Sequence, residues 1–176
     1  MPISKEEFSK HFPSVMQHMS TADVAAFVQA LTPMQLAKGE TLIRDGESND
    51  AIYFVKNGSL EASIEKNGKK SPLGRVVAGQ WLGEVSMLDP GPATATVTAI
   101  SDCELLRLTR ADFENLDQHR PMLMNVVLRA LSKLLIERLR SSTDLLIQLT
   151  DDRRHSSKAV RERSTDAYAA LVGTRR

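Results

Sequence analysis

The pattern of residues changes sharply near Met34 and again near Thr109, and this change constrains the fold more than any other feature. Eight of the nine glycines lie between these positions, among short runs rich in β-branched and aromatic residues. Such runs, separated by glycine turns, are typical of β-strands. We expect strands near 34–37, 41–44, 51–55, 60–65, 71–77, 95–100 and 104–109. Many short strands with regular turns predict a β-sandwich or a jelly-roll barrel over 34–109.

Helices are predicted before this glycine-rich region, in an N-terminal helical segment at 1–33. Ser4 and Glu7 have capping-box spacing, and Pro13 ends the first helix. A second helix is expected with Thr21 as its N-cap, and it ends before Pro33. Its apolar face is formed by Val24, Phe27, Val28 and Leu31.

After the barrel, 110–150 is expected to contain helices, with a long one over 121–150. An apolar stripe follows this helix through Met124, Leu128, Leu131, Leu135, Leu139, Leu146 and Leu149. A helix of this length is longer than a small barrel, so one face can pack on the barrel and another on a partner helix. We therefore expect a homodimer through 121–150. Residues 151–176 are polar and basic, which predicts a solvated tail.

The composition excludes several classes of partner. The 23 Lys and Arg residues balance 22 Asp and Glu residues, so the chain has no overall bias toward nucleic acid or an anionic membrane. No segment approaches the roughly 20 apolar residues of a membrane span. The single cysteine, Cys103, fits a reducing compartment. We expect a soluble, cytoplasmic protein.

Catalytic motifs and metal-ligand patterns were not found. Metal-dependent jelly-roll enzymes take histidine ligands from barrel strands, and all four histidines lie outside 34–109: His11, His18, His119 and His155. The sequence also contains no His-Glu-x-x-His motif, no Gly-x-Ser-x-Gly motif and no Walker loop. We expect no enzymatic activity, no metal site and no resident cofactor.

The stretch 83–97 is the strongest candidate for a binding site. It opens with Gly83 and Glu84, and it ends in a small-residue run that includes Ala93 and Thr94. A turn whose N–H groups point at one spot can bind an anion, and a carboxylate nearby can accept hydrogen bonds from ribose hydroxyls. An arginine normally completes such a phosphate site. The stretch contains no Lys or Arg.

These residues resemble the phosphate-binding cassette of cyclic nucleotide-binding domains. Further matching positions are Gly39-Glu40, Gly46, Asp50, Ile52-Tyr53-Phe54-Val55, Gly58, Gly79 and Ala95-Thr96-Val97 with Ala99. The resemblance covers Thr21 to Thr150 and extends to the ligand-sensing half of catabolite activators and to channel and kinase regulatory domains. It implies an α+β fold: a β jelly-roll (double-stranded β-helix) barrel with N-terminal helices and a long C-terminal helix.

The resemblance also implies roles for individual residues. Gly83 and Glu84 would meet the ribose and phosphate of cAMP, cGMP or another cyclic nucleotide. The N–H groups of Ala93 and Thr94, and the Thr94 hydroxyl, would meet the phosphate. The base would be read from the long helix, either by Arg138 or by Ser142 and Thr143, and we favour the second pair.

The family carries an arginine where this chain has Ala93, and this departure leaves the ligand in question. Removing a charge-assisted hydrogen bond costs about 1.5–3 kcal/mol, on the order of tenfold to over a hundredfold in affinity. A cation from elsewhere in the chain could compensate. The candidates are Arg75, Arg107, Arg129 and Arg138.

Three functions follow from this reading. The first is a sensor module that signals to an effector protein, as yet unknown, through its long helix. The alternative is a degenerate domain that acts as a dimerising interaction scaffold or binds a different kind of ligand. The third is a DNA-binding regulator, which would need on the order of 50 residues for a helix-turn-helix unit after Thr150. Only 26 residues follow Thr150, so we expect no sequence-specific DNA binding.

Overall fold

A computed structural model describes residues 3–16 and 19–172 of the chain. It separates into two units, with the boundary between Leu131 and Ser132. The first unit contains all the strands and the shorter helices, and the second contains the rest of the last helix. The candidate cassette at 83–97 lies within the first unit.

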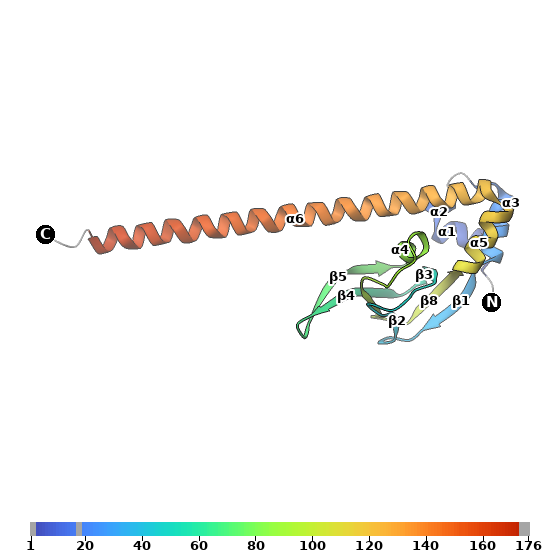
Figure 1. The fold of residues 1–176 in the computed structure, drawn as a ribbon, viewed down its shortest axis with the longest axis horizontal. Helices are drawn as coiled ribbons and strands as arrows, with labels where there is room; N and C mark the ends of the chain where they lie inside the picture. Colours follow the sequence, from blue (N-terminus) through green and yellow to red (C-terminus); the bar gives the residue numbers. More distant parts are fainter. Residues whose placement is uncertain (1–2, 17–18, 173–176) are drawn as a thin grey trace. The chain divides into compact units, whose positions relative to one another are not determined.

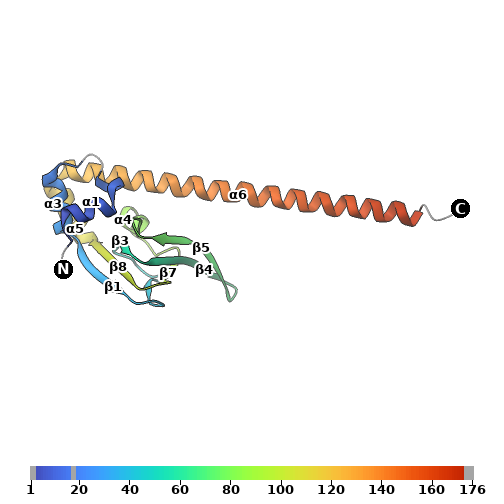
Figure 2. The same cartoon turned by 180° about the vertical axis from the view of Figure 1, so that it is seen from behind.

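Three short helices precede the strands: α1 (Lys5–His11), α2 (Pro13–Met16) and α3 (Thr21–Gln29). The Ser4 hydroxyl caps α1 by accepting the Glu7 N–H at 3.1 Å, as the capping-box spacing predicted. The N-cap of α3 is Ser20, one residue before the predicted Thr21, because the Ser20 hydroxyl accepts the Asp23 N–H. Figures 1 and 2 both show α1, α3 and α5 (Arg110–His119) grouped beside the ends of β1 and β8.

Eight strands form two antiparallel four-stranded sheets, which confirms the jelly-roll expectation. Sheet A has the order β1-β8-β3-β6, and sheet B has the order β2-β7-β4-β5. The strands are β1 (Thr32–Leu36), β2 (Thr41–Ile43), β3 (Ala51–Asn57), β4 (Ser59–Lys66), β5 (Lys69–Val77), β6 (Trp81–Leu82), β7 (Thr96–Ala99) and β8 (Cys103–Thr109). Sequence reasoning missed β6, since two residues are too few to show a period. It also began β1 late, because Pro33 looked like a breaker, yet β1 is an edge strand and tolerates proline there.

Each sheet contributes one apolar face to a core between the sheets. This core contains Leu36, Ala51, Tyr53, Val55, Leu60, Val76, Leu82, Val97, Ala99, Cys103 and Leu105. The members of β3 alternate along the strand, as the period of two in a strand requires. Phe54, between two of them, therefore faces the opposite side of sheet A. There it packs against Phe8, Phe12 and Phe27 of the N-terminal segment.

The last helix, α6 (Pro121–Val172), extends beyond the predicted end at Thr150. Its sequence contains no glycine and no further proline between Met122 and Val172, so nothing in the chain interrupts the backbone hydrogen bonds. Within the first unit, α6 buries Leu123, Met124, Val127 and Leu131. This part of the predicted apolar stripe is thus a packing face of the first unit.

Lys56 of β3 joins the N-terminal helices to sheet A through two ion pairs. Its Nζ lies 2.8 Å from Glu7 of α1 and 3.1 Å from Glu104 of β8. The hydrogen bond from Lys56 lowers the pKa of Glu7 below its ordinary value of 4.5, and the same contact lowers the pKa of Glu104. Both carboxylates therefore favour the folded state when they are ionised.

We expect Lys56→Met to remove a pH-dependent part of the stability. A depressed carboxylate pKa contributes stability above its unfolded value of 4.5, and this contribution is lost as the pH falls through the folded pKa. The variant should therefore lose stability at neutral pH and approach the wild type in acid, as urea unfolding across this range would measure. Lys5→Met is the control, because the Lys5–Glu6 pair is exposed and 3.9 Å long. An equal loss at every pH would contradict this account.

Candidate ligand-binding site

The stretch 83–97 begins at a tight turn between β6 and α4 (Glu84–Leu88). Gly83 has a φ of 91°, in the left-handed region that favours glycine. A Cβ at this position would overlap the Ala51 carbonyl oxygen and lie 3.1 Å from Asn49 Nδ2. Asn49 also donates a hydrogen bond of 2.8 Å to that same carbonyl. Gly83 is therefore required both by its backbone angle and by the close approach of β3.

We expect Gly83→Ala to be more destabilising than Gly39→Ala by about 1–3 kcal/mol, the usual cost of overpacking. Gly39 is a matched control, since its φ is 90° but a Cβ there would meet nothing within 4 Å. The two variants therefore share the backbone strain and differ in the collision with Ala51. Chemical unfolding measures both values. Equal destabilisation would mean that the turn can move away from β3.

Glu84, the first residue of α4, is 1% exposed. Burying a carboxylate is costly unless polar groups compensate it, so such residues are rarely found inside a domain without a local reason. The neighbouring Ser86 is also buried, whereas Val85 and Leu88 of the same helix are exposed. The cassette helix thus buries two polar side chains together with Met87 and leaves two apolar ones at the surface.

Arg110, the first residue of α5, holds the far end of α4. Its guanidinium donates to the carbonyl oxygen of Met87 at 3.3 Å and to that of Ser86. These are carbonyls of the last turn, which lack partners inside a helix. The Arg110 N–H donates to the Asp50 carbonyl at 2.7 Å. Arg110 therefore links α4, the start of β3 and α5, a role that sequence reasoning missed.

The end of the cassette is fixed by the segment around Gly46. The Ala93 N–H donates to the Glu47 carbonyl at 2.8 Å, and the Ala93 carbonyl accepts the Gly46 N–H at 2.8 Å. The N–H that the resemblance assigned to a phosphate is thus bonded to Glu47 in this structure. Thr94 is exposed beside it.

The two predicted base-reading residues lie on α6 in the second unit. Ser142 and Thr143 are both exposed. The Thr143 hydroxyl donates to the Leu139 carbonyl at 2.9 Å, within its own helix. Gly83, Glu84, Ala93 and Thr94 therefore belong to the stretch 83–97 of the first unit, whereas Ser142 and Thr143 belong to the second unit.

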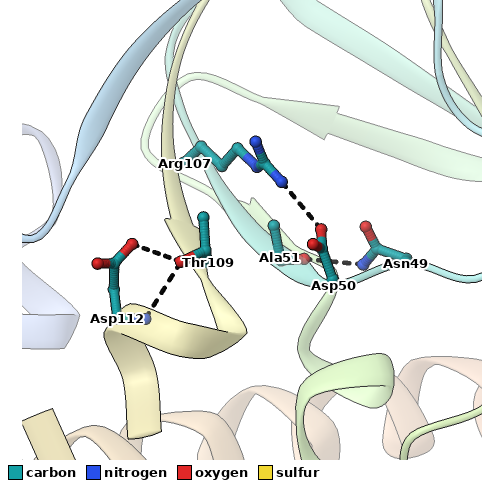
Figure 3. A network of polar contacts seen from close by, with 6 residues as sticks. All are labelled: Asn49, Asp50, Ala51, Arg107, Thr109 and Asp112. Carbon is teal, nitrogen blue, oxygen red and sulfur yellow. Dashed lines mark hydrogen bonds and ion pairs between the residues drawn. The ribbon is translucent and has the colours of Figure 1, made fainter. Parts of the chain in front are cut away.

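A polar cluster lies next to the turn, at the start of β3 and the end of β8. Arg107 Nη2 donates to Asp50 Oδ1 at 2.9 Å (Figure 3). The side-chain amide of Asn49 donates to the carbonyl oxygen of Ala51. Burial raises the pKa of Tyr53, the cross-strand neighbour of Arg107, while the Arg107 charge acts in the opposite direction. Figure 3 also shows Thr109, whose hydroxyl caps α5 at Asp112.

The described part of the chain shows neither a metal cluster nor a membrane-spanning helix. Residues 3–16 and 19–172 contain no group of three or more His, Cys, Asp or Glu side chains that could hold a metal ion. Over the same residues, the structure has no helix with the length and apolar character needed to cross a membrane.

Comparison with known proteins identifies the region that carries these features. The family model described as "Cyclic nucleotide-binding domain" matches residues 33–120, half of the chain. The match begins within β1, includes both sheets and the cassette, and ends after α5.

Proteins similar to this chain differ in length and in function. The lysophospholipase nte1 of Aspergillus fumigatus is 30% identical over 82% of this chain and 9% of its own length. A CRP-like cAMP-activated global transcriptional regulator of Mycobacterium tuberculosis is 28% identical over 77% of this chain and 59% of its own. A solved cyclic nucleotide-binding domain from Methylobacillus flagellatus has a TM-score of 0.74 at 24% identity, covering 80% of this chain and 82% of that one. This chain thus spans only part of both curated relatives.

Proposed function

The chain belongs to the cyclic nucleotide-binding domain family, and on this premise we propose that it is a regulatory module that binds a cyclic nucleotide at 83–97. One observation carries the proposal: the left-handed Gly83 turn places a buried acid, Glu84, at the start of a short helix. A carboxylate in a family site of this kind can accept hydrogen bonds from ribose hydroxyls. The ligand would be cAMP, cGMP or another cyclic nucleotide.

Thr94 of the cassette would bind the phosphate of the ligand. Thr94 is exposed, and its hydroxyl can donate to a phosphate oxygen. Ser142 and Thr143 remain our candidates for reading the base, since their hydroxyls can donate to or accept from base edges. Calorimetric titration of the protein with cAMP, cGMP and a cyclic dinucleotide tests which class of ligand it binds.

Signalling to an effector protein requires the ligand to favour one arrangement of the helices over another. Arg110 supplies a physical link for this, because it bonds the cassette helix α4 and begins α5, which leads into α6. We propose that a ligand that moves α4 acts on α5 through these hydrogen bonds and so reaches α6. The effector would bind α6.

We propose that α6 also forms a homodimer. Several of its large apolar side chains are exposed, including Ile136 at 49%, Leu139 at 68%, Leu146 at 64% and Ile147 at 56%. An exposed apolar row on a helix is typical of an interface with another helix. A second copy presents the same row, so a symmetric pair would bury both.

Leu139→Arg is expected to convert the dimer to a monomer, because it places a charge in the proposed helix–helix seam. Sedimentation velocity over a range of concentrations measures the change. Lys133→Arg, at an exposed position of the same helix, is the control and should remain dimeric. A wild-type chain that stays monomeric at high concentration would contradict the dimer proposal.

A second candidate function is favoured by Ala93. The stretch 83–97 contains no Lys or Arg, and the Ala93 N–H is bonded to Glu47. A domain with this cassette could act as a dimerising scaffold that holds a partner without a nucleotide. Capture of an α6-binding partner that is insensitive to cAMP and cGMP would favour the scaffold over the sensor.

We also propose that the module acts in the cytoplasm. Its only cysteine, Cys103, is a buried free thiol in the core between the sheets. Cytosolic proteins keep such thiols reduced. Localisation of a tagged full-length protein by fractionation tests this assignment.

A further inference from the structure

The cassette needs a cation that its own sequence does not contain, and the structure offers one on β8. Arg107 lies on the same face of β8 as Leu105 and Cys103, which are two and four residues earlier and both belong to the core between the sheets. Its cross-strand partner on β3, Tyr53, belongs to the same core. Because side chains two residues apart in a strand share a face, Arg107 points to the inner side of sheet A.

This guanidinium is linked to the start of the cassette through the first residues of β3. It donates to Asp50, the residue immediately before Ala51 (Figure 3). The Ala51 carbonyl in turn lies against Gly83. The contact between Arg107 and Asp50 joins residues 57 positions apart in the sequence. The fold therefore pairs a cation with the β3 segment that packs against the turn, although the cassette itself has none.

One donor of Arg107 has no acceptor. Its Nε is buried, and it hydrogen-bonds to none of the residues that the structure describes. Nε and Nη2 form one edge of the guanidinium, the edge that binds two oxygens of a phosphate or carboxylate side by side. Asp50 takes only the Nη2 position of this edge, at 2.9 Å. An anion with two oxygens could satisfy both donors.

Asp50 competes with such an anion for Arg107, but it holds the guanidinium only weakly. Its side chain is 66% exposed, whereas that of Arg107 is 37% exposed. Ion pairs with an exposed partner contribute little to stability, because water solvates the carboxylate nearly as well. Asp50 can therefore turn into solvent when an anion binds Arg107.

The other candidate arginines are engaged or face elsewhere. Arg75 is exposed and alternates with the inward-facing Val76 on β5, so it points away from the core. Arg129 Nε donates to Asn125 on its own helix at 2.9 Å. Arg138 is exposed on α6, in the second unit. Arg110, which was not a candidate from the sequence, is bonded to the carbonyls of α4.

We propose that Arg107 binds the phosphate of the ligand through Nε and Nη2, in place of the arginine that the family carries at position 93. This inference rests on the proposed function and names the residue that would give it a cation. The ligand is then a nucleotide, with its phosphate as a diester or a monoester. A nucleoside, which has no phosphate, would not bind Arg107.

The test compares cAMP with adenosine, by calorimetry, on four forms of the full chain. Arg107→Gln should weaken cAMP binding on the order of tenfold to a hundredfold and leave adenosine binding unchanged. Asp50→Asn should strengthen cAMP binding severalfold, because it removes the competing carboxylate. Arg75→Gln is the matched control and should behave as the wild type.

Each outcome separates this inference from the proposed function. If Arg107→Gln binds cAMP as tightly as the wild type, Arg107 is not the phosphate ligand, while the sensor function stands. If the wild type binds no cyclic nucleotide, both are overturned. If circular dichroism shows that Arg107→Gln does not fold, the Asp50→Asn variant provides the test. Unchanged cAMP affinity in Asp50→Asn would overturn the role of Arg107.

Discussion

Replacing Ala93 with arginine is expected to tighten cAMP binding by about tenfold to over a hundredfold. The substitution adds a charge-assisted hydrogen bond at the position where the family has one. The backbone there is already fixed by Gly46 and Glu47, so the new side chain starts from a rigid support. Ala93 itself is only partly buried, which leaves room for a longer side chain.

Calorimetry on Ala93→Arg and Ala93→Gln separates charge from size. Only the arginine variant should gain affinity, and its gain should shrink as salt is added, because exposed charges are screened. An equal gain in both variants would attribute the effect to packing. No gain in either would mean that this loop does not contact the ligand phosphate.

Phe54→Ala is expected to cost about 3–5 kcal/mol of unfolding free energy, the largest stability effect that we anticipate. Phe54 is fully buried, and its ring stacks on Trp81 with centroids 5.3 Å apart and an interplanar angle of 8°. It also makes edge contacts with Phe12 at 5.4 Å and Phe27 at 5.9 Å. The substitution would therefore leave a cavity exactly between sheet A and the N-terminal helices.

Urea unfolding of Phe54→Ala measures this loss, with Phe113→Ala as the control. Phe113 is partly exposed and lies on α5, outside the aromatic cluster. Phe113→Ala should therefore lose much less unfolding free energy than Phe54→Ala. A loss below about 1 kcal/mol for Phe54→Ala would show that the N-terminal helices do not depend on this cluster.

The fold could be predicted because its signals are local. Glycines such as Gly46 and Gly58 adopt positive φ, as does Asn67 in the turn that it forms with Gly68. The apolar alternation in β3 and β8 likewise appears in the sequence itself. β6 has only two residues, and α6 has no breaker at its predicted end, so neither boundary had a local signal.

The cassette was predicted from its own residues, but its neighbours were not. Arg107 and Asp50 are brought together only by the pairing of β8 with β3, and Arg110 reaches α4 only in the folded chain. The bond between Ala93 and Glu47 likewise depends on how two distant loops meet. The roles of Ser142 and Thr143 stay predictions.

The central claim is that this chain binds a cyclic nucleotide in spite of Ala93. Calorimetric titration of the wild-type protein with cAMP and cGMP, at physiological salt, tests it most directly. We expect saturable binding with one site per chain, weaker than that of Ala93→Arg. No heat of binding for either nucleotide in the wild type, together with saturable binding by Ala93→Arg, would contradict the claim and leave a nucleotide-free scaffold.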